Sequence, residues 1–346
     1  MKRSFTLLIA LMGCGQPPTA PTIPYDALSQ YGFFKGNMAD QAPAGGIVPY
    51  DVISVLYADG AGKFRFLVVP QGKQIHFDPL NRWTFPDGTF IIKTFYYELD
   101  QRNPGSKRRL LETRLLIDQG GTWDAQTYVW NQAQTEAYRY VAGESIHLDY
   151  TDQNGAAGSV DYQVPDSSQC KNCHGQDKLI TPLGPRTRQM NRAHDYGNGP
   201  ENQIAHIASL GLFDADPGDP AKLTALADPR GNAPASDHAR AYLDANCAHC
   251  HNTHGYASST NLQLNIETMN AIDLGVCRHP VAAGMASGGF LYDVNPGMPD
   301  QSIMVYRMKS NDPQIKMPQL PLTTVDQTGV DLVSQWIAGL SDPPCQ

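Results

Sequence analysis

The sequence of 346 residues predicts a multidomain protein in which an antiparallel β-sandwich precedes a mainly α-helical region. Three observations lead to this fold class. Short alternating runs separated by turn sequences fill residues 50–162, two copies of Cys-x-x-Cys-His follow, and helical patterns flank the second copy. We therefore expect a sandwich domain over 25–165, a segment with the first motif over 166–235, and a second helical domain over 236–346.

The first residues have the features of an export signal. Residues 1–13 place two positive charges before an apolar run that is too short to span a bilayer. The run ends in Leu-Met-Gly-Cys, so Cys14 stands where bacterial lipoproteins carry their acylated cysteine; an ordinary signal peptide is the alternative. Gly15 favours sorting to the outer membrane, and the Pro-rich residues 14–24 predict an extended tether. We expect an outer membrane lipoprotein that faces the periplasm or the cell surface.

The charge of the chain argues against nucleic acid as a partner. The formal net charge is −8, with 26 basic residues scattered among 34 acidic ones. Neutralising phosphates requires a clustered basic surface, which no stretch of this sequence supplies.

The region before the motifs alternates as strands do, and Gly, Asp, Asn and Pro fill its turns. In the run that begins at Phe90, alternation places Phe90, Ile92, Thr94 and Tyr96 on one face and Ile91, Lys93 and Phe95 on the other. The tryptophans of this region are core residues or, alternatively, a platform for a polysaccharide; they are Trp83, Trp123 and Trp130.

The two motifs identify a cofactor. They comprise Cys170, Cys173 and His174 in the first copy, and Cys247, Cys250 and His251 in the second. A redox dithiol needs no following histidine, and the competing interpretation is one zinc site made from both cysteine pairs. In c-type haem attachment the thiols bond to the haem vinyl groups and the histidine binds the iron. The sequence therefore predicts two covalently attached haem c groups.

Helical patterns surround the second motif. A helix capped by Ser236 leads into it, and an amphipathic helix around Trp336 ends the chain, a pairing that resembles the cytochrome c fold. Met317 lies on the segment before the last helix, where we expect the second axial ligand of this iron. Met298 and Met308 are the alternatives.

The first motif follows an extended stretch, and its helix comes afterwards. An apolar stripe at helical spacing predicts a helix around His206, which we expect to be the second ligand of the first iron. Met190 and His194 are the alternatives. Because the two haem sites lie in separate parts of the chain, we expect each to titrate independently.

Two cysteines remain outside these motifs. Cys277 and Cys345 lie in the same C-terminal segment, and an exported chain usually avoids free thiols. A disulfide between them is the simplest assignment, and two free thiols are the alternative.

Several stretches carry a resemblance to a known family: "FPDGTFIIKTF", "LLETRLLI", "LGPRTRQMNR", "NQIAHIASLGLF", "ARAYLDANCAHCH", "PVAAGMASGG" and "MVYRMKSNDPQIKMP". Through them the chain resembles bacterial diheme c-type cytochrome lipoproteins with an N-terminal β domain, from about Tyr50 to the end. The resemblance implies periplasmic electron transfer with one haem on each motif.

Two classes of function follow. The first is an electron carrier with two six-coordinate irons and a redox partner protein, with which a polysaccharide contact by the β domain is compatible. The second is an enzyme that resembles the diheme peroxidases, with one open iron. Arg186 and Arg188 are the charged residues that the sequence offers near such an iron. We expect the carrier.

Overall fold

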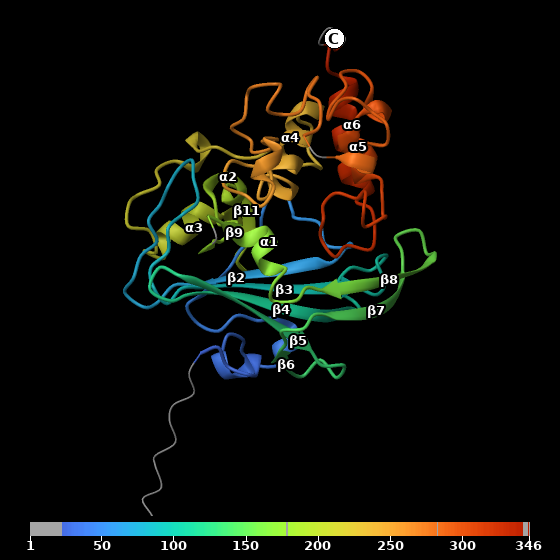
Figure 1. Ribbon diagram of the computed structural model, residues 1–346. Coiled ribbons are helices and arrows are strands. Elements are labelled where there is room, and N and C mark those ends of the chain that lie inside the picture. Colours follow the sequence, from blue (N-terminus) through green and yellow to red (C-terminus); the bar gives the residue numbers. More distant parts are fainter. Residues whose placement is uncertain (1–22, 178, 282, 342–344, 346) are drawn as a thin grey trace, which may run out of the picture.

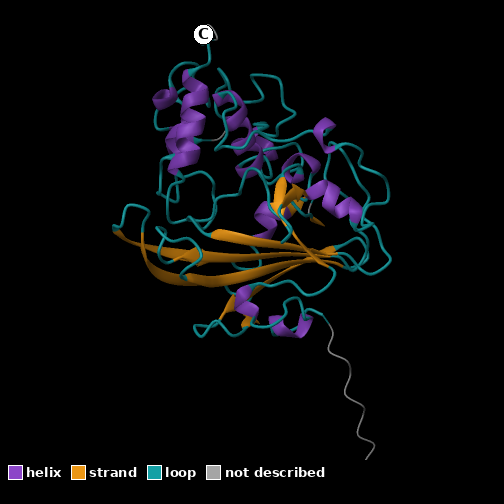
Figure 2. Cartoon of the chain, turned by 180° about the vertical axis from the view of Figure 1, so that it is seen from behind, coloured by secondary structure: helices purple, strands orange, loops and turns teal. Residues whose placement is uncertain are grey.

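The computed structural model describes residues 23–177, 179–281, 283–341 and 345. The predicted signal peptide and Cys14 lie outside the described residues. Three layers are visible in Figure 1: the N-terminal segment below a sheet, the sheet itself, and the helices above it. Figure 2 shows the same layers from behind. We call the face of the sheet that is turned toward α1 and α4 its upper face.

A six-stranded antiparallel sheet forms the middle layer, and its strands lie side by side in chain order. They are β1 Ile47–Pro49, β2 Gly62–Val68, β3 Phe90–Glu98, β4 Arg108–Asp118, β5 Trp123–Trp130 and β6 Ala137–Arg139. Two further strands, β7 Glu144–Thr151 and β8 Ala157–Val164, pair with each other as a separate hairpin. The strands have the alternating pattern that the sequence predicts, because successive side chains point to opposite faces.

The lower face of the sheet is closed by the N-terminal segment. Ile92 of β3 and Leu115 of β4 are fully buried there, in one cluster with Leu28 and Phe33 from the segment before β1. Apolar burial of this kind contributes most of the stability of a domain.

The upper face is covered by two different parts of the chain. At one end the β7–β8 hairpin packs Leu148 and Tyr162 against Phe95. At the other end, Ile91 and its neighbours share a core with Met190 of the segment that follows the first motif. The predicted boundary at residue 165 therefore runs through a continuous hydrophobic core.

The layer above the sheet contains the α-helices, which are α1 Cys170–His174, α2 Thr187–Met190, α3 Gln203–Ser209, α4 Ala235–Asn246, α5 Ile303–Met308 and α6 Gln327–Ala338. Its short strand pairs are β9 Gly175–Gln176 with β10 Leu179–Ile180, and β11 Ala193–Asp195 with β12 Pro200–Asn202. The 3₁₀ turns of the chain are η1 Leu28–Tyr31, η2 Met38–Asp40, η3 Pro220–Lys222, η4 Ser258–Thr260, η5 Gly284–Ser287 and η6 Pro299–Gln301. None of the helices in the described residues is long and apolar enough to cross a membrane.

The predicted fold class is wrong. The sequence indicated an antiparallel β-sandwich followed by a mainly α diheme region with a cytochrome c-like C-terminal part. The described chain is instead mostly β, with a six-stranded antiparallel sheet and six small α-helices, and 21% of it is helical. Between α4 and α5 the described residues form only turns and loops, since Gly, Pro and Asn recur there and disfavour helix. The second sheet of a sandwich is reduced to the β7–β8 hairpin, because the motif-bearing segment occupies the rest of the upper face.

Helices α4 and α6 pack against each other in a core that includes Leu243, Val333 and Trp336. Helix α4 begins at Ala235, so Ser236 lies inside its first turn and is not the N-cap. Gly329 permits the close approach of α6, because a Cβ atom there would lie 2.1 Å from Cζ of Tyr242.

Replacing Gly329 with Ala should therefore destabilise the chain by about 1–3 kcal/mol, since the tyrosine ring must move out of a packed core. The free energy of unfolding in urea measures this loss. Gly339→Ala is the matched control, because a Cβ there would meet only ordinary contacts of 3.5 Å. Equal stability of the two variants would show that the helices do not pack as described.

Candidate functional site

The two Cys-x-x-Cys-His motifs lie against each other. The thiol of Cys250 is 3.3 Å from the carbonyl oxygen of Asn172, which lies between the cysteines of the first motif. Beside this contact, His254 Nδ1 is 3.3 Å from the carboxylate of Asp177. The two motifs are therefore far apart along the chain but close together in space, so the reason for expecting two independent haem sites does not hold.

The first motif forms α1 above the sheet (Figure 1). The carboxylate of Asp166 accepts hydrogen bonds from the backbone of Ser168 and Gln169 at 2.7 and 2.9 Å, which fixes the turn that leads into the motif. His174 Nδ1 is 3.0 Å from the carbonyl oxygen of Thr181. A carbonyl only accepts, so Nδ1 carries the proton and Nε2 keeps its lone pair. Burial lowers the pKa of His174 to about 3, which keeps the ring neutral.

The second motif repeats this arrangement. His251 Nδ1 is 3.3 Å from the hydroxyl oxygen of Thr260, which donates its own proton to the carbonyl of Ala257 at 2.7 Å. The hydroxyl therefore accepts from Nδ1, and Nε2 of His251 is left with its lone pair. Burial lowers the pKa of His251 to about 4. Histidine ligands of metals are usually oriented by such a hydrogen bond from the second nitrogen.

The motif cysteines are free thiols. Burial raises the pKa of Cys247 and of Cys250 to about 12, and it also raises the pKa of Cys170 and Cys173. A redox dithiol relies on a lowered thiol pKa, so these cysteines are unlike one. Within the described ranges, no group of three or more His, Cys, Asp or Glu side chains is arranged to hold a bare metal ion. The zinc alternative thus has no support here.

A cavity of about 780 Å³ lies between the upper face of the sheet and the first motif. Cys170, Cys173 and His174 line it from above, together with His249 of the second motif. Its volume is within the range of cofactor pockets, roughly 300–1,000 Å³. Two thiols and an imidazole with a free Nε2 face one space, and this donor set fits a covalently attached haem.

A second cavity, of about 200 Å³, lies beside the second motif. Its lining includes Cys247, Cys250 and His251, and also Met317 from the loop before α6. Met308 lines this cavity too, whereas Met298 is half exposed and does not. Two thiols, an imidazole and a thioether therefore face one space. This donor set is that of a haem c, while the volume of the cavity lies below the range of roughly 300–1,000 Å³ for cofactor pockets.

None of the three side chains that the sequence offered as a second ligand for the first iron lines the first cavity. His206 stacks on Tyr196 with ring centroids 3.5 Å apart and pairs with a carboxylate. His194 lies against the same tyrosine ring, and Met190 is fully buried in the core between the sheet and α3. The assignment of His206 thus gains no support from this geometry.

The sequence did not predict the position of His249, which we expected to be a neighbour of solvent or of a haem propionate at the second motif. It occupies a variable position inside the second motif and lines the cavities of both motifs. Burial lowers its pKa to about 4, and its Nδ1 has no hydrogen-bond partner in the described part of the chain. Nothing in the local sequence marks this residue, because its role depends on the packing of one motif against the other.

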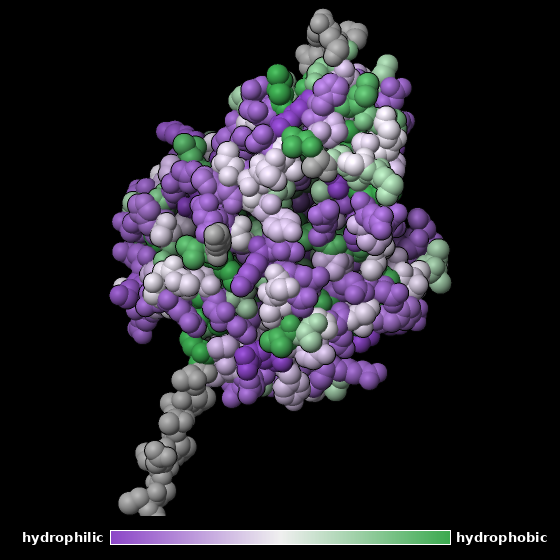
Figure 3. Space-filling view, in the orientation of Figure 1, coloured by the Kyte–Doolittle hydropathy of each residue, from purple (hydrophilic) through white to green (hydrophobic). Residues whose placement is uncertain are grey.

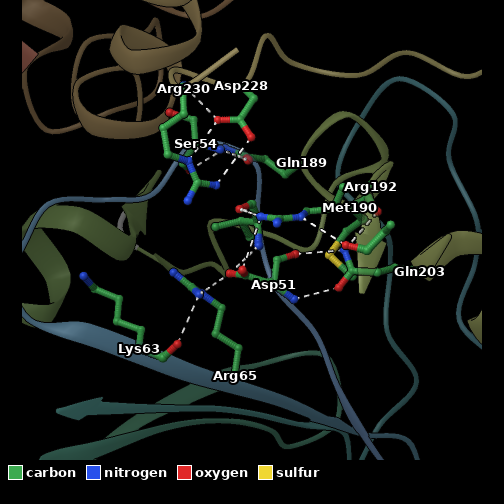
Figure 4. A network of polar contacts seen from close by, with 12 residues as sticks. Asp51, Ser54, Lys63, Arg65, Gln189, Met190, Arg192, Gln203, Asp228 and Arg230 are labelled. Carbon is green, nitrogen blue, oxygen red and sulfur yellow. Dashed lines mark hydrogen bonds and ion pairs between the residues drawn. The ribbon is translucent and has the colours of Figure 1, made fainter. Parts of the chain in front are cut away.

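The floor of the first cavity is cationic. Arg65 of β2 lies opposite Lys93 of β3, and Lys93 lies opposite Arg114 of β4. We call these three residues the cation row. Figure 4 shows Arg65 pointing to Asp51, with Nη1 2.9 Å from Oδ1, while Arg192 holds the other oxygen at 3.2 Å.

The remaining predicted features lie away from these cavities. Cys277 and Cys345 form a disulfide that ties the end of the chain to the loop after α4. Trp83 and Trp130 are buried, as core residues are, and do not form an exposed platform with Trp123. The face shown in Figure 3 is mostly hydrophilic, with hydrophobic residues scattered over it.

Comparison of the chain with protein-family models, with curated proteins and with solved structures gave no match. The functional argument therefore rests on the two motifs, on their contact, and on the cavities that they face.

Proposed function

We propose that this protein is an exported diheme c-type cytochrome that exchanges electrons with a partner protein. The observation that carries the proposal is the repeated geometry of the motifs. In each one the histidine Nδ1 is held by a hydrogen bond, and the histidine and both thiols face a cavity. A redox dithiol would require neither feature. A single zinc site would need both cysteine pairs around one ion, whereas here each motif lines a cavity of its own.

Each residue of the motifs has a defined task in this function. The two thiols of each motif would hold a haem covalently, and His174 and His251 would each bind its iron through Nε2. A bound haem supplies reversible one-electron transfer at its iron. The hydrogen bonds from Nδ1 to Thr181 and Thr260 keep the ring orientation fixed in both redox states.

The contact between the motifs supports electron exchange within the chain. Cys250 touches the backbone of the first motif, so a charge at one site lies close to the other and is screened little by solvent. We infer that the two reduction potentials are coupled. With a haem on each motif, the charge of one site would influence the affinity of the other site for an electron.

The proposal includes the site of action. The charge and apolar pattern of residues 1–13, followed by Cys14, supports an outer membrane lipoprotein with its folded part in the periplasm or at the cell surface.

A second candidate is an enzyme in which the first iron has an open coordination position. It is favoured by the placement of His206, His194 and Met190, none of which lines the cavity beside His174. The two candidates differ in the role of His249, which lines the cavity beside His174. If His249 binds the first iron, the coordination position is filled and the protein is a carrier; if it does not, the position is open, as the enzyme requires.

Electron paramagnetic resonance of the oxidised protein tests this choice. If His249 binds the first iron, the wild type should show two low-spin signals, and His249→Ala should convert one of them to high spin. His206→Ala is the control and should leave both signals unchanged. A high-spin signal in the wild type would favour the enzyme.

Haem stoichiometry tests the proposed function itself. Denatured wild type should keep two haems per chain after acid and organic extraction, because thioether bonds survive this treatment. The double change Cys170→Ala and Cys173→Ala should leave one haem, and so should Cys247→Ala with Cys250→Ala. Complete extraction of haem from the wild type would refute the proposal.

Met317 should be the sulfur ligand of the second iron. Met317→Ala should remove the near-infrared band of thioether-ligated ferric haem and lower the potential of that haem. The other potential should shift by a smaller amount, because the motifs touch. Met298→Ala, at a half-exposed position outside the cavity, is the control. Loss of the band in Met308→Ala instead would move the ligand to α5.

A further inference from the structure

We propose that the cation row is an oxyanion-binding site, built to hold a carboxylate or an inorganic oxyanion in the first cavity. The row and the cavity floor belong to the sheet, so binding of a free oxyanion does not depend on the proposed function, whereas binding of a haem propionate rests on it. Two sources offer this chemistry: a propionate of the haem on the first motif, and a small free oxyanion from solution.

The first argument is the register of the sheet. Arg65, Lys93 and Arg114 are direct cross-strand neighbours on three adjacent strands, and their side chains share the upper face. Like charges directly opposite each other destabilise an antiparallel pair. Along β3 the next position on the same face is the buried Ile91, so an apolar side chain is what this surface otherwise carries. Residues that destabilise the fold locally, as these adjacent like charges do, are typical of a functional site.

The second argument is the distribution of counter-charges. Arg114 donates to Glu112 at 2.7 Å, and the hydroxyl of Tyr162 donates to the same carboxylate at 2.6 Å. Arg65 has Asp51. Lys93, between the two arginines, has no ion pair with a carboxylate of the described residues, and its ammonium lies 5.4 Å from the centre of the Phe95 ring.

Lys63 repeats the situation of Lys93. Lys63 lies two residues before Arg65 on β2. Its ammonium group donates to the carbonyl of Ala61 at 3.0 Å and lies 5.3 Å from the centre of the same Phe95 ring. The guanidinium of Arg114 lies 4.3 Å from that ring. Three cations thus gather around one aromatic ring, which stabilises a cation but does not neutralise it.

Electrostatics agrees with this picture. Burial, together with the charges of the neighbouring Arg114 and Arg65, lowers the pKa of Lys93 to about 7. Burial and the same kind of repulsion hold the pKa of Lys63 well below its usual value. A bound anion would remove both costs, because it would restore the charged lysines.

The roof of the cavity adds two more cations. Arg82 donates to neutral partners, the carbonyl of Pro182 at 2.9 Å and the side chain of Gln176. The Nε of Arg186 is buried without a partner in the described residues, and its nearest carboxylate, on Asp244, is 3.9 Å away. Guanidinium groups bind carboxylates and other oxyanions through paired hydrogen bonds, which suits planar or tetrahedral oxygen ligands.

The experiment uses the haem-loaded protein and the variant Lys93→Met, which keeps the length of the side chain and removes its charge. Lys73→Met, at an exposed lysine, is the matched control. Sodium sulfate is titrated into each protein in a calorimeter at constant ionic strength. In parallel, the potential of the first haem is measured as a function of pH. Thermal unfolding checks the fold of each variant, and Lys93→Met should be at least as stable as the wild type because it loses a buried unpaired charge.

Two results support the proposal and separate its sources. If the source is a free oxyanion, sulfate binds the wild type and Lys93→Met binds it at least about tenfold more weakly, the loss expected for one charge-assisted hydrogen bond. If the source is a propionate, sulfate does not bind. The pH at which the potential of the first haem becomes pH-dependent then moves upward in Lys93→Met, since a carboxylate without its cation holds its proton more tightly.

Two results overturn it. One is sulfate binding of equal strength in the wild type and in Lys93→Met. The other is no sulfate binding together with an unchanged pH profile. Haem stoichiometry is measured on the same samples. Absence of covalent haem in the wild type would refute the proposed function, and the comparison of sulfate binding between the wild type and Lys93→Met would still test the cation row, so the two failures are distinguishable.

Discussion

The burial of the upper face of the sheet is the constraint on which the rest of the structure depends. A six-stranded sheet with both faces apolar must be covered twice. The N-terminal segment covers the lower face, and the upper face is shared between the β7–β8 hairpin and the segment after the first motif. Ile91 and Met190 lie in this second contact, which anchors the chain immediately after α1. The first motif is thereby fixed above the sheet, and the second motif packs against the first.

Local patterns in the sequence located the motifs and most of the strands, but the run over residues 51–58 that also reads as a strand forms none. Alternation predicted which side chains of β3 share a face, and Ile92 and Lys93 do lie on opposite sides of the sheet. The number of layers was not predictable in the same way. An apolar strand face can be covered by a second sheet or by loops and short helices. Which of these covers it depends on residues far away in the chain, and the alternation within a strand does not indicate them.

In the candidate site, too, the features set by neighbouring residues are predictable from the sequence, and those set by contacts between distant residues are not. The motif residues are recognisable from their spacing alone, but the position of His249 beside the first motif follows from the contact between residues 172 and 250. The cation row is invisible in the sequence for a related reason. Arg65, Lys93 and Arg114 are isolated charges on three strands, and only the register of two strand pairs brings them into line. His206 was favoured because it lies on an apolar helix, yet tertiary packing turns that helix toward Tyr196.

The Cys277–Cys345 disulfide has a consequence for how the protein is assembled. One pair of cysteines is oxidised to a disulfide, while the four cysteines of the motifs in the same chain are free thiols. Thiol–disulfide exchange proceeds through the thiolate, and burial raises the pKa of Cys247 and Cys250 to about 12. Once folded, the second motif is therefore a slow partner for scrambling with Cys277 or Cys345. Burial of the second motif therefore slows thiol–disulfide exchange with the Cys277–Cys345 bond. The fold thus helps to preserve both the disulfide and the free thiols of the motif.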